Sequence, residues 1–167
     1  MIAVPDSENL DERELTITRL FGAPRELVFA LWTEPRHLKK WWGPKVFTNP
    51  VCEIDLRPGG ALTIVMRAPN GDEYPMKGIF QEIVRPERLV FTSIAVGAGG
   101  EPLLNGVTTV TFEDVDGRTR MTLHTRATAL VTLANRMLEG MDAGWTQSID
   151  RLEDLISEEN VRPRPGV

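Results

Sequence analysis

The chain has few of the residues that form disulfides or metal sites. Of its 167 residues, one is cysteine and two are histidine. A single cysteine cannot form an intramolecular disulfide, and Cys52 alternates with apolar residues as a buried thiol would. A metal site needs three or four converging ligands, and neither HxxxH, CxxC nor HxH occurs. We therefore expect no disulfide, no bound metal and no cofactor.

Long apolar runs and targeting signals are also missing. No window reaches the 18 or so apolar residues that a membrane span needs, so we expect none. Residues 1–13 lack a basic stretch followed by an apolar run, so we expect no secretory signal and a cytoplasmic location. The net charge of −5 argues against nucleic acid as a partner.

The motifs of common catalytic sites do not occur. There is no GxSxG sequence, and Cys52 has no evident neighbouring base. The GAGG sequence at 97–100 lacks the GK[ST] ending of a phosphate loop. Glu113 and Asp114 are adjacent in a strand-like run and so face opposite ways, while His124 is out of phase with its apolar neighbours and should face solvent. We predict no catalytic residues.

The overall composition is that of an ordinary globular protein. Hydrophobic residues make up 41% of the chain and charged residues 26%. This length favours a single domain, 1–167, that is large enough to bury a core without disulfides. The ends, 1–11 and 160–167, are polar and contain proline, which predicts frayed termini around an ordered core at about 13–158.

The first part of the chain predicts one strand followed by two short helices. Residues 14–21 alternate apolar and polar side chains, which is typical of a strand. Pro24 suits the first turn of a helix, and Pro35 ends that helix because the residue before a proline resists helical geometry. A second helix is predicted over 36–42, where a Gly-Pro pair follows.

From Val51 onward the hydrophobic period changes to two, which predicts strands. Asn70-Gly71 and Asp116-Gly117 are hairpin signals, and no helical segment separates the strands. The sheet should therefore be antiparallel. The glycine-rich stretch 97–106 is predicted as a loop. The six strands are expected at 51–57, 61–68, 74–84, 88–95, 106–114 and 118–126.

Residues 129–158 form one long amphipathic segment after the last strand. A helix of about 20 to 28 residues would be roughly 30 to 42 Å long, enough to cross a small domain. The sheet is the surface available to bury its apolar stripe, and the space between such a helix and a curved sheet is a natural small-molecule cavity. Apolar residues recur at intervals of three and four, at Met137, Leu138, Met141, Trp145, Ile149, Leu152, Leu155 and Ile156.

Charge is unevenly distributed between two segments. Residues 25–45 contain five basic and two acidic side chains, whereas residues 139–159 contain seven acidic side chains and one basic. Two solvated faces of opposite sign explain this pattern. A docking surface for a charged partner is the alternative.

Four motifs, in this order along the chain, resemble one known family. They are VFALWTEPRHLKKWWGP (28–44), DLRPGG (55–60), GIFQEIVRPERLVFT (78–92) and GWTQSIDRLEDL (144–155). The chain is similar to single-domain SRPBCC proteins related to the C-terminal domain of the activator of the heat-shock-protein ATPase. The resemblance implies an α+β helix-grip fold: a curved antiparallel sheet of about seven strands around a long C-terminal helix, with two short helices after the first strand.

The resemblance implies three alternative functions. The first is a binding module for a small apolar or amphipathic ligand, held between sheet and C-terminal helix. The second is a co-chaperone-like protein of the stress response that docks on a heat-shock ATPase. The third is a cyclase- or hydratase-like enzyme, because some members of the wider superfamily cyclise or hydrate their ligands.

Nine residues are candidates to line a cavity. The tryptophans could form its walls, the methionines could adapt to irregular ligands, and a threonine face of 106–114 could supply hydroxyls. Ordinary core packing is the alternative for each of them. The candidates are Trp42, Met66, Met76, Phe80, Phe91, Thr109, Met141, Trp145 and Ile149.

Overall fold

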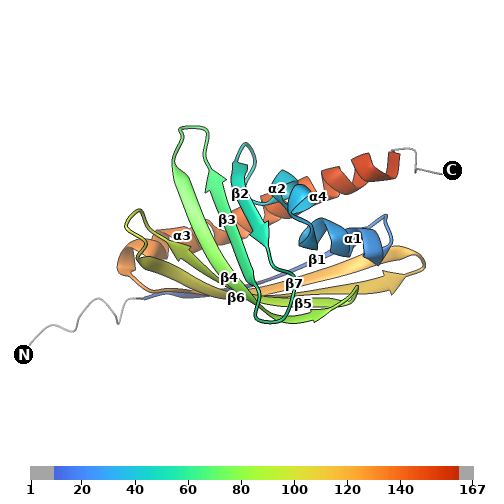
Figure 1. Cartoon of the computed structure of the whole chain (residues 1–167), viewed down its shortest axis with the longest axis horizontal. Coiled ribbons are helices and arrows are strands. Elements are labelled where there is room, and N and C mark those ends of the chain that lie inside the picture. The colour runs from blue at the N-terminus through green and yellow to red at the C-terminus, as the bar shows by residue number, and fades with distance from the viewer. Residues whose placement is uncertain (1–9, 162–167) are drawn as a thin grey trace, which may run out of the picture.

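The computed structural model describes residues 10–161 and forms one seven-stranded sheet with helices on its concave face (Figure 1). The helix-grip architecture expected from the sequence is confirmed. The elements are β1 (Glu12–Phe21), α1 (Arg25–Thr33), α2 (Pro35–Trp41), β2 (Thr48–Ile54), β3 (Ala61–Arg67), β4 (Glu73–Val84), β5 (Arg88–Val96), β6 (Pro102–Val115), β7 (Arg118–Ala129), the 3₁₀ helix η2 (Thr132–Ala134), α3 (Asn135–Glu139) and α4 (Met141–Val161).

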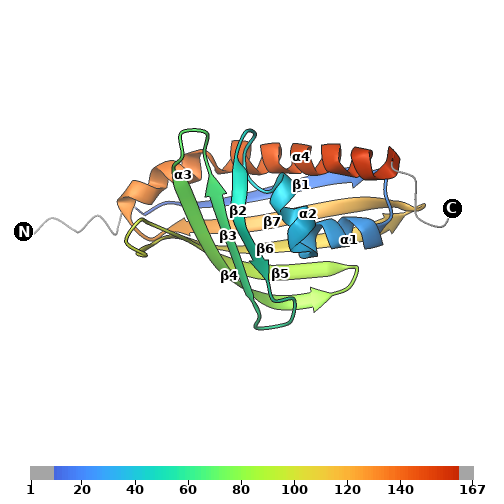
Figure 2. The ribbon, with the colours of Figure 1, turned by 45° about the horizontal axis from the view of Figure 1, so that its top comes forward.

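Every strand pair is antiparallel, in the order β1-β7-β6-β5-β4-β3-β2. Strands β2 to β7 are successive hairpins, and β1 adds to the free edge of β7. Figure 2 shows α4 lying along the sheet, with β2, β3 and β4 turned steeply away from β1, β6 and β7. This curvature lets the sheet wrap around α4 instead of lying flat beneath it.

Turn residues fix the hairpins, as the sequence predicts. Asp116 and Gly117 both have positive φ, 54° and 85°, the backbone of a type I′ turn. At the DLRPGG motif, a Cβ on Gly60 would lie 2.0 Å from the Asp55 carbonyl oxygen, so only glycine fits. The Arg57 Nε donates to Asp55 Oδ2 at 2.8 Å. The motif is therefore a structural turn.

The core lies between the sheet and the three helices α1, α2 and α4. Helix α1 packs on β6, where the rings of Phe29 and Phe112 meet edge to face at 5.7 Å. Trp41, at the end of α2, is fully buried and donates its indole N–H to the Leu31 carbonyl at 2.9 Å. Ile149 on α4 is also fully buried. Helices α1 and α2 therefore cover one end of the concave face and leave the other end to α3 and α4.

The predicted C-terminal helix occupies only part of the segment 129–158. Strand β7 continues through Ala129, whose N–H donates to the Asp11 carbonyl at 2.9 Å, so the segment begins as sheet. A 3₁₀ turn and the short α3 follow, and Gly140 separates α3 from α4. Glycine lacks a Cβ and disfavours a helix interior, which explains the break. Helix α4 has 21 residues, within the expected length.

Two strands and one terminus also differ from prediction. Strand β2 begins at Thr48, three residues early, and β6 begins at Pro102, inside the predicted loop. Most of the two predicted frayed ends, 1–9 and 162–167, lies outside the described residues. Asp11 is held in place, because its N–H donates to Asn135 Oδ1 at 3.0 Å. Within 10–161, no helix is both long enough and apolar enough to cross a membrane.

Candidate functional site

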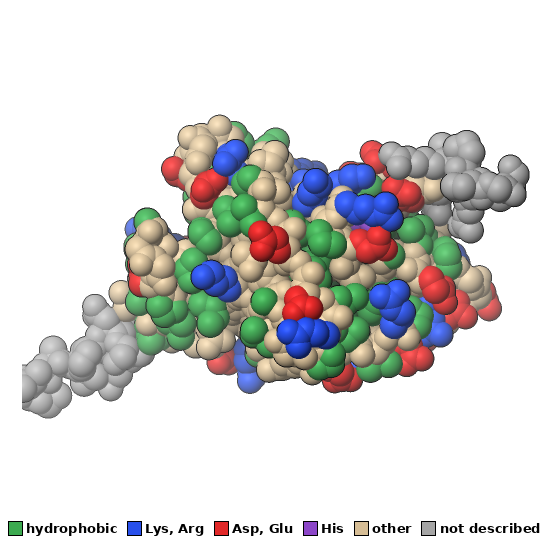
Figure 3. Space-filling model, in the orientation of Figure 1, with side chains coloured by type: hydrophobic (Ala, Val, Ile, Leu, Met, Phe, Trp, Pro, Cys, Tyr) green, Lys and Arg blue, Asp and Glu red, His purple; other side chains and the backbone are tan. Residues whose placement is uncertain are grey.

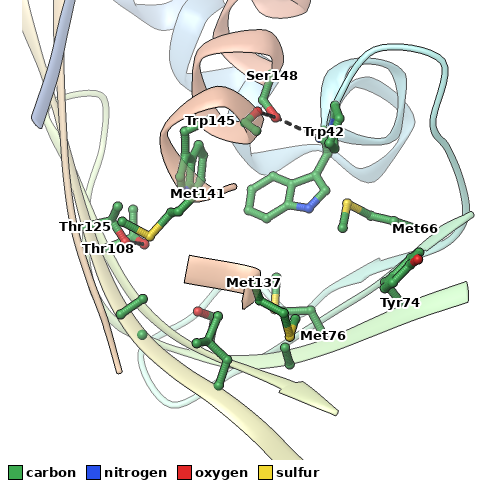
Figure 4. Close-up of a pocket in the computed structure, with 18 of the residues that line it drawn as sticks. Trp42, Met66, Tyr74, Met76, Thr108, Thr125, Met137, Met141, Trp145 and Ser148 are labelled. Carbon is green, nitrogen blue, oxygen red and sulfur yellow. Dashed lines mark hydrogen bonds between the residues drawn. The ribbon is translucent and has the colours of Figure 1, made fainter. Parts of the chain in front are cut away.

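A cavity of about 250 Å³ lies between the concave face of the sheet and helices α3 and α4 (Figure 4). Strands β3 to β7 form its floor, α3 and α4 form its roof, and the loop after α2 closes one side. It is lined by Trp42, Gly43, Pro44, Met66, Tyr74, Pro75, Met76, Ser93, Ala95, Leu104, Gly106, Thr108, Thr125, Ala127, Met137, Met141, Gly144, Trp145 and Ser148. None of these lining side chains carries a full charge at neutral pH.

Four of the chain's six methionines line this cavity. Met66 is on β3, Met76 on β4, Met137 on α3 and Met141 on α4, so the sulfur atoms come from four separate elements. Met137 and Tyr74 are 36% and 42% exposed, which places the opening of the cavity near them. Methionine side chains are flexible and polarisable, so this wall can adapt to an irregular apolar ligand.

Three tryptophans form an aromatic wall at the α2 end of the cavity. The rings of Trp42 and Trp145 meet edge to face, with centroids 5.3 Å apart. Behind them Trp32 is 3% exposed, and its ring lies 6.4 Å from that of Trp145 in a stacked arrangement. Aromatic pairs of this geometry contribute about 0.5 to 1.5 kcal/mol each beyond area burial. The wall is therefore well supported by rings outside the cavity.

The loop after α2 carries Trp42 and is anchored to α4 by Arg151. The Arg151 Nη1 donates to the carbonyl oxygens of Trp42, Gly43 and Pro44, each at 3.0 Å, and Nη2 donates to Lys40 O at 3.0 Å. Burial lowers the pKa of this guanidinium from its usual value. The carbonyls at the end of a helix lack intrahelical donors, and a cation there also suits the helix dipole. One side chain thus fixes the loop that positions Trp42.

The lining contains few polar side chains, and three of them, Thr108, Thr125 and Ser148, are hydrogen-bonded. Thr108 and Thr125 are opposite each other in the β6–β7 ladder, and their hydroxyl oxygens are 2.9 Å apart. Ser148 Oγ accepts from Gly43 N at 3.0 Å and donates to Gly144 O at 2.9 Å. The lining therefore suits an apolar body with few polar contacts.

The structure brings five of the nine sequence candidates to the cavity: Trp42, Met66, Met76, Met141 and Trp145. Three others are core residues that do not line it. Phe80 and Phe91 are each 2% exposed and meet edge to face at 6.3 Å, and Ile149 is 0% exposed. Their side chains point into the protein interior, as predicted, but they pack in the core and do not contact the cavity.

The ninth candidate, Thr109, lies on the convex face of its strand, so its prediction as a lining residue is wrong. Thr108, Val110 and Phe112 are buried on the concave face, whereas Val107 is 41% exposed and Thr109 shares its side. The sequence contains a signal for this phase, because Thr108 alternates with two large apolar residues. Thr125, Ser148 and Met137 also line the cavity. Of these, only Met137 carries a sequence signal, the apolar stripe of its segment.

The structure offers little for covalent or metal chemistry elsewhere. Burial raises the pKa of the Cys52 thiol to about 11, so the reactive thiolate is scarce at neutral pH. Among the residues described, no group of three or more His, Cys, Asp or Glu side chains could hold a metal ion. His124 pairs with Glu14 on the convex face, 42% exposed, as expected for a solvent-facing side chain.

Solved structures of bacterial proteins resemble this chain over most of its length. One from Nitrosomonas europaea is 30% identical, with a TM-score of 0.70 and coverage of 89% of this chain and 97% of that one. One from Chromobacterium violaceum is 27% identical, with a TM-score of 0.75 and coverage of 86% and 96%. The AHSA1 protein of Silicibacter pomeroyi is 23% identical, with a TM-score of 0.73 and coverage of 88% and 99%, and this likeness shows the fold alone.

The family comparison is consistent with the fold. Among curated proteins, none matches the chain. The family model described as activator of Hsp90 ATPase homolog 1-like protein matches residues 22–157. This range includes α1, α2 and every strand except β1. The chain therefore belongs to the family of Hsp90 ATPase activator homolog 1-like proteins.

Proposed function

We propose that this protein is a cytoplasmic binding module for a small apolar or amphipathic molecule, held between the sheet and helices α3 and α4. The observation that carries the proposal is the cavity of about 250 Å³, lined by methionine and tryptophan and free of charged side chains. Ligand sites are typically concave and mostly apolar, with a few placed polar groups.

The size of the cavity argues against a packing defect. Core truncations relate cavity volume to lost stability at about 24 cal/mol per Å³, so a dry cavity of this size would cost up to roughly 6 kcal/mol. That is comparable to the whole stability of many domains, about 5 to 15 kcal/mol. Partial opening near Met137 and Tyr74 reduces the cost by admitting water. A ligand that displaced this water would recover apolar contacts.

Thermal shift measurements with fatty acids, sterols and flavonoids test the proposal. A ligand at a hundredfold excess over its Kd stabilises the folded state by about 2.7 kcal/mol, which raises Tm measurably. The variant Ala95→Phe places a ring in the cavity lining and should abolish the shift. Ile94→Phe places the same ring one residue away, where Ile94 is 40% exposed, and should keep it. Equal shifts in both variants would locate binding elsewhere.

Trp145 gives an independent test of the open cavity. Replacing a fully packed aromatic residue with alanine costs about 3 to 5 kcal/mol. Trp145 is only partly buried and borders the cavity, so we expect Trp145→Ala to cost less than that range in chemical denaturation. A loss within the full range, together with no thermal shift from any ligand, would indicate a closed and packed core.

Docking on a heat-shock ATPase is the second candidate, favoured by the description of the family and by the charge distribution. Exposed Arg36, Lys39 and Lys40 on α2 form a basic patch, and Figure 3 shows basic side chains gathered there. Enzymatic turnover has less support. The lining residues that the structure describes include no pair of ionisable side chains for acid–base chemistry.

A further inference from the structure

The indole N–H of Trp42 has no acceptor among the residues that the structure describes. Trp42 is 9% exposed, and Figure 4 shows the nitrogen edge of its ring directed into the cavity. Its neighbour Trp41, by contrast, donates to a carbonyl oxygen. The indole N–H of a tryptophan inside a protein usually has a hydrogen-bond partner. The cavity thus presents one directed donor.

A second donor lies on the other side of the cavity, at the Thr108–Thr125 pair (Figure 4). These threonines are 1% and 3% exposed. Two hydroxyls carry two protons, and the single bond between them uses one. Within the described part of the chain, no other acceptor is bonded to either hydroxyl, so one O–H remains available.

The remaining chemistry of the lining selects against charge. Ser148 donates its single hydroxyl proton to Gly144 O and accepts from Gly43 N, so it adds no free donor. A carboxylate or ammonium group on a ligand would enter an apolar space without a counter-charge, which is strongly unfavourable. The polar groups of the lining, which also include the hydroxyls of Tyr74 and Ser93, are all neutral. Among them only the indole N–H of Trp42 is restricted to donating, so it matches an uncharged acceptor such as a carbonyl oxygen.

The volume also limits the ligand. A cavity of about 250 Å³ is below the roughly 300 to 1,000 Å³ of sites for drug-sized molecules, and equals about eight water molecules at about 30 Å³ each. Large polycyclic or long-chain molecules would need the wall to move or would protrude past Met137 and Tyr74. A compact ligand fits in the cavity without movement of its walls.

We propose that the ligand is a small, neutral, largely apolar molecule whose carbonyl oxygen accepts a hydrogen bond from Trp42 Nε1, with the threonine pair as a second donor. This rests on the proposed function of the same cavity and adds the chemical class. In this arrangement Trp42 is the specificity-determining residue, and the methionines supply a tolerant apolar surface.

Benzophenone and diphenylmethane test this, because they differ by C=O in place of CH₂. Equilibrium dialysis would give the Kd of each for the wild-type protein and for Trp42→Phe, which keeps a ring and removes the N–H. We expect Trp42→Phe to weaken benzophenone by about threefold to tenfold, the range for one hydrogen bond, and diphenylmethane by less than about twofold. Thr109→Val, on the convex face of β6, is the matched control and should change neither Kd.

The Thr108→Val variant removes a hydroxyl from the second donor without changing shape, and should also weaken benzophenone selectively. If circular dichroism shows that Trp42→Phe does not fold, the comparison of the two probes in Thr108→Val tests the carbonyl assignment instead. Equal effects of either variant on both probes would overturn the carbonyl assignment and leave the binding module intact. The carbonyl assignment also fails if members of the wider ligand panel bind and benzophenone does not. If no compound binds at all, the proposed function fails together with the assignment.

Discussion

Replacing Arg151 should show how strongly one side chain fixes the cavity wall. Arg151 on α4 donates to four carbonyl oxygens at the end of α2, at Lys40, Trp42, Gly43 and Pro44. The Nη1 atom has two protons for three of these acceptors, and Nη2 supplies one proton to the fourth. Three guanidinium protons of Arg151 therefore form the hydrogen bonds between α4 and this loop. Arg151→Met keeps an apolar stem and removes all of them.

The expected loss follows from the strength and exposure of these bonds. A hydrogen bond to a charged group contributes about 1.5 to 3 kcal/mol, so three would give an upper figure of several kcal/mol. The site is only half-buried, and water can reach some carbonyls when the arginine is removed. We expect Arg151→Met to lower the free energy of unfolding by about 2 to 4 kcal/mol, about 4 to 16 °C in Tm for a chain of this size.

Urea denaturation followed by tryptophan fluorescence measures this loss. Arg120→Met is the control, because the guanidinium of Arg120 is 45% exposed and pairs with an exposed Glu113 at 3.2 Å. Such surface pairs contribute about 0 to 1 kcal/mol. The free energies of unfolding of the two variants should differ clearly. Agreement within about 0.5 kcal/mol would refute the idea that Arg151 anchors the loop.

Four further perturbations test other parts of the structure. Deleting residues 141–167 should give an insoluble or molten product by circular dichroism, because α4 supplies much of the core, and a cooperatively folding product would contradict the role of α4. Burial lowers the pKa of His37, so the stability from its neutral form is present above about pH 6.5 and is lost as pH falls through the folded pKa. His37→Leu should therefore reduce the loss of Tm between pH 7.5 and 5, and an unchanged pH profile would rule this out. A Cβ on Gly144 would come no nearer than 4.0 Å to Pro44, so Gly144→Ala should leave stability unchanged or raise it by up to about 1 kcal/mol, whereas a clear loss would show that the helix has no room there. A pull-down from lysate at low salt should recover no heat-shock ATPase, and a salt-sensitive capture would instead favour the docking function.

The sequence determined the fold because its local patterns agree with one another. A period of two, glycine-containing turns such as Asp116-Gly117, and the absence of helices between strands leave an antiparallel sheet as the simple solution. The apolar stripe that includes Ile149 requires a helix packed on that sheet. These features depend on neighbours in the chain, so they can be derived from residue order alone.

Tertiary structure decided where the cavity lies and which residues line it. Met66, Met76, Met137 and Met141 come from four elements, and only the curvature of the sheet brings them together around one space. Whether an inward residue lines that space or packs beyond it depends on depth, which periodicity does not encode.

Two of the corrections have different physical origins. The end of β7 at Ala129 is set by pairing with β6 and by the Asp11 carbonyl, which are distant in sequence, so the amphipathic pattern of 129–158 alone could not show it. The error for Thr109 differs, because the alternation of Thr108 with Val110 and Phe112 already indicates the inward face, and the pairing of Thr108 with Thr125 across the sheet agrees with it. Long-range pairing therefore decided the end of β7, whereas the face of Thr109 can be derived from the local pattern.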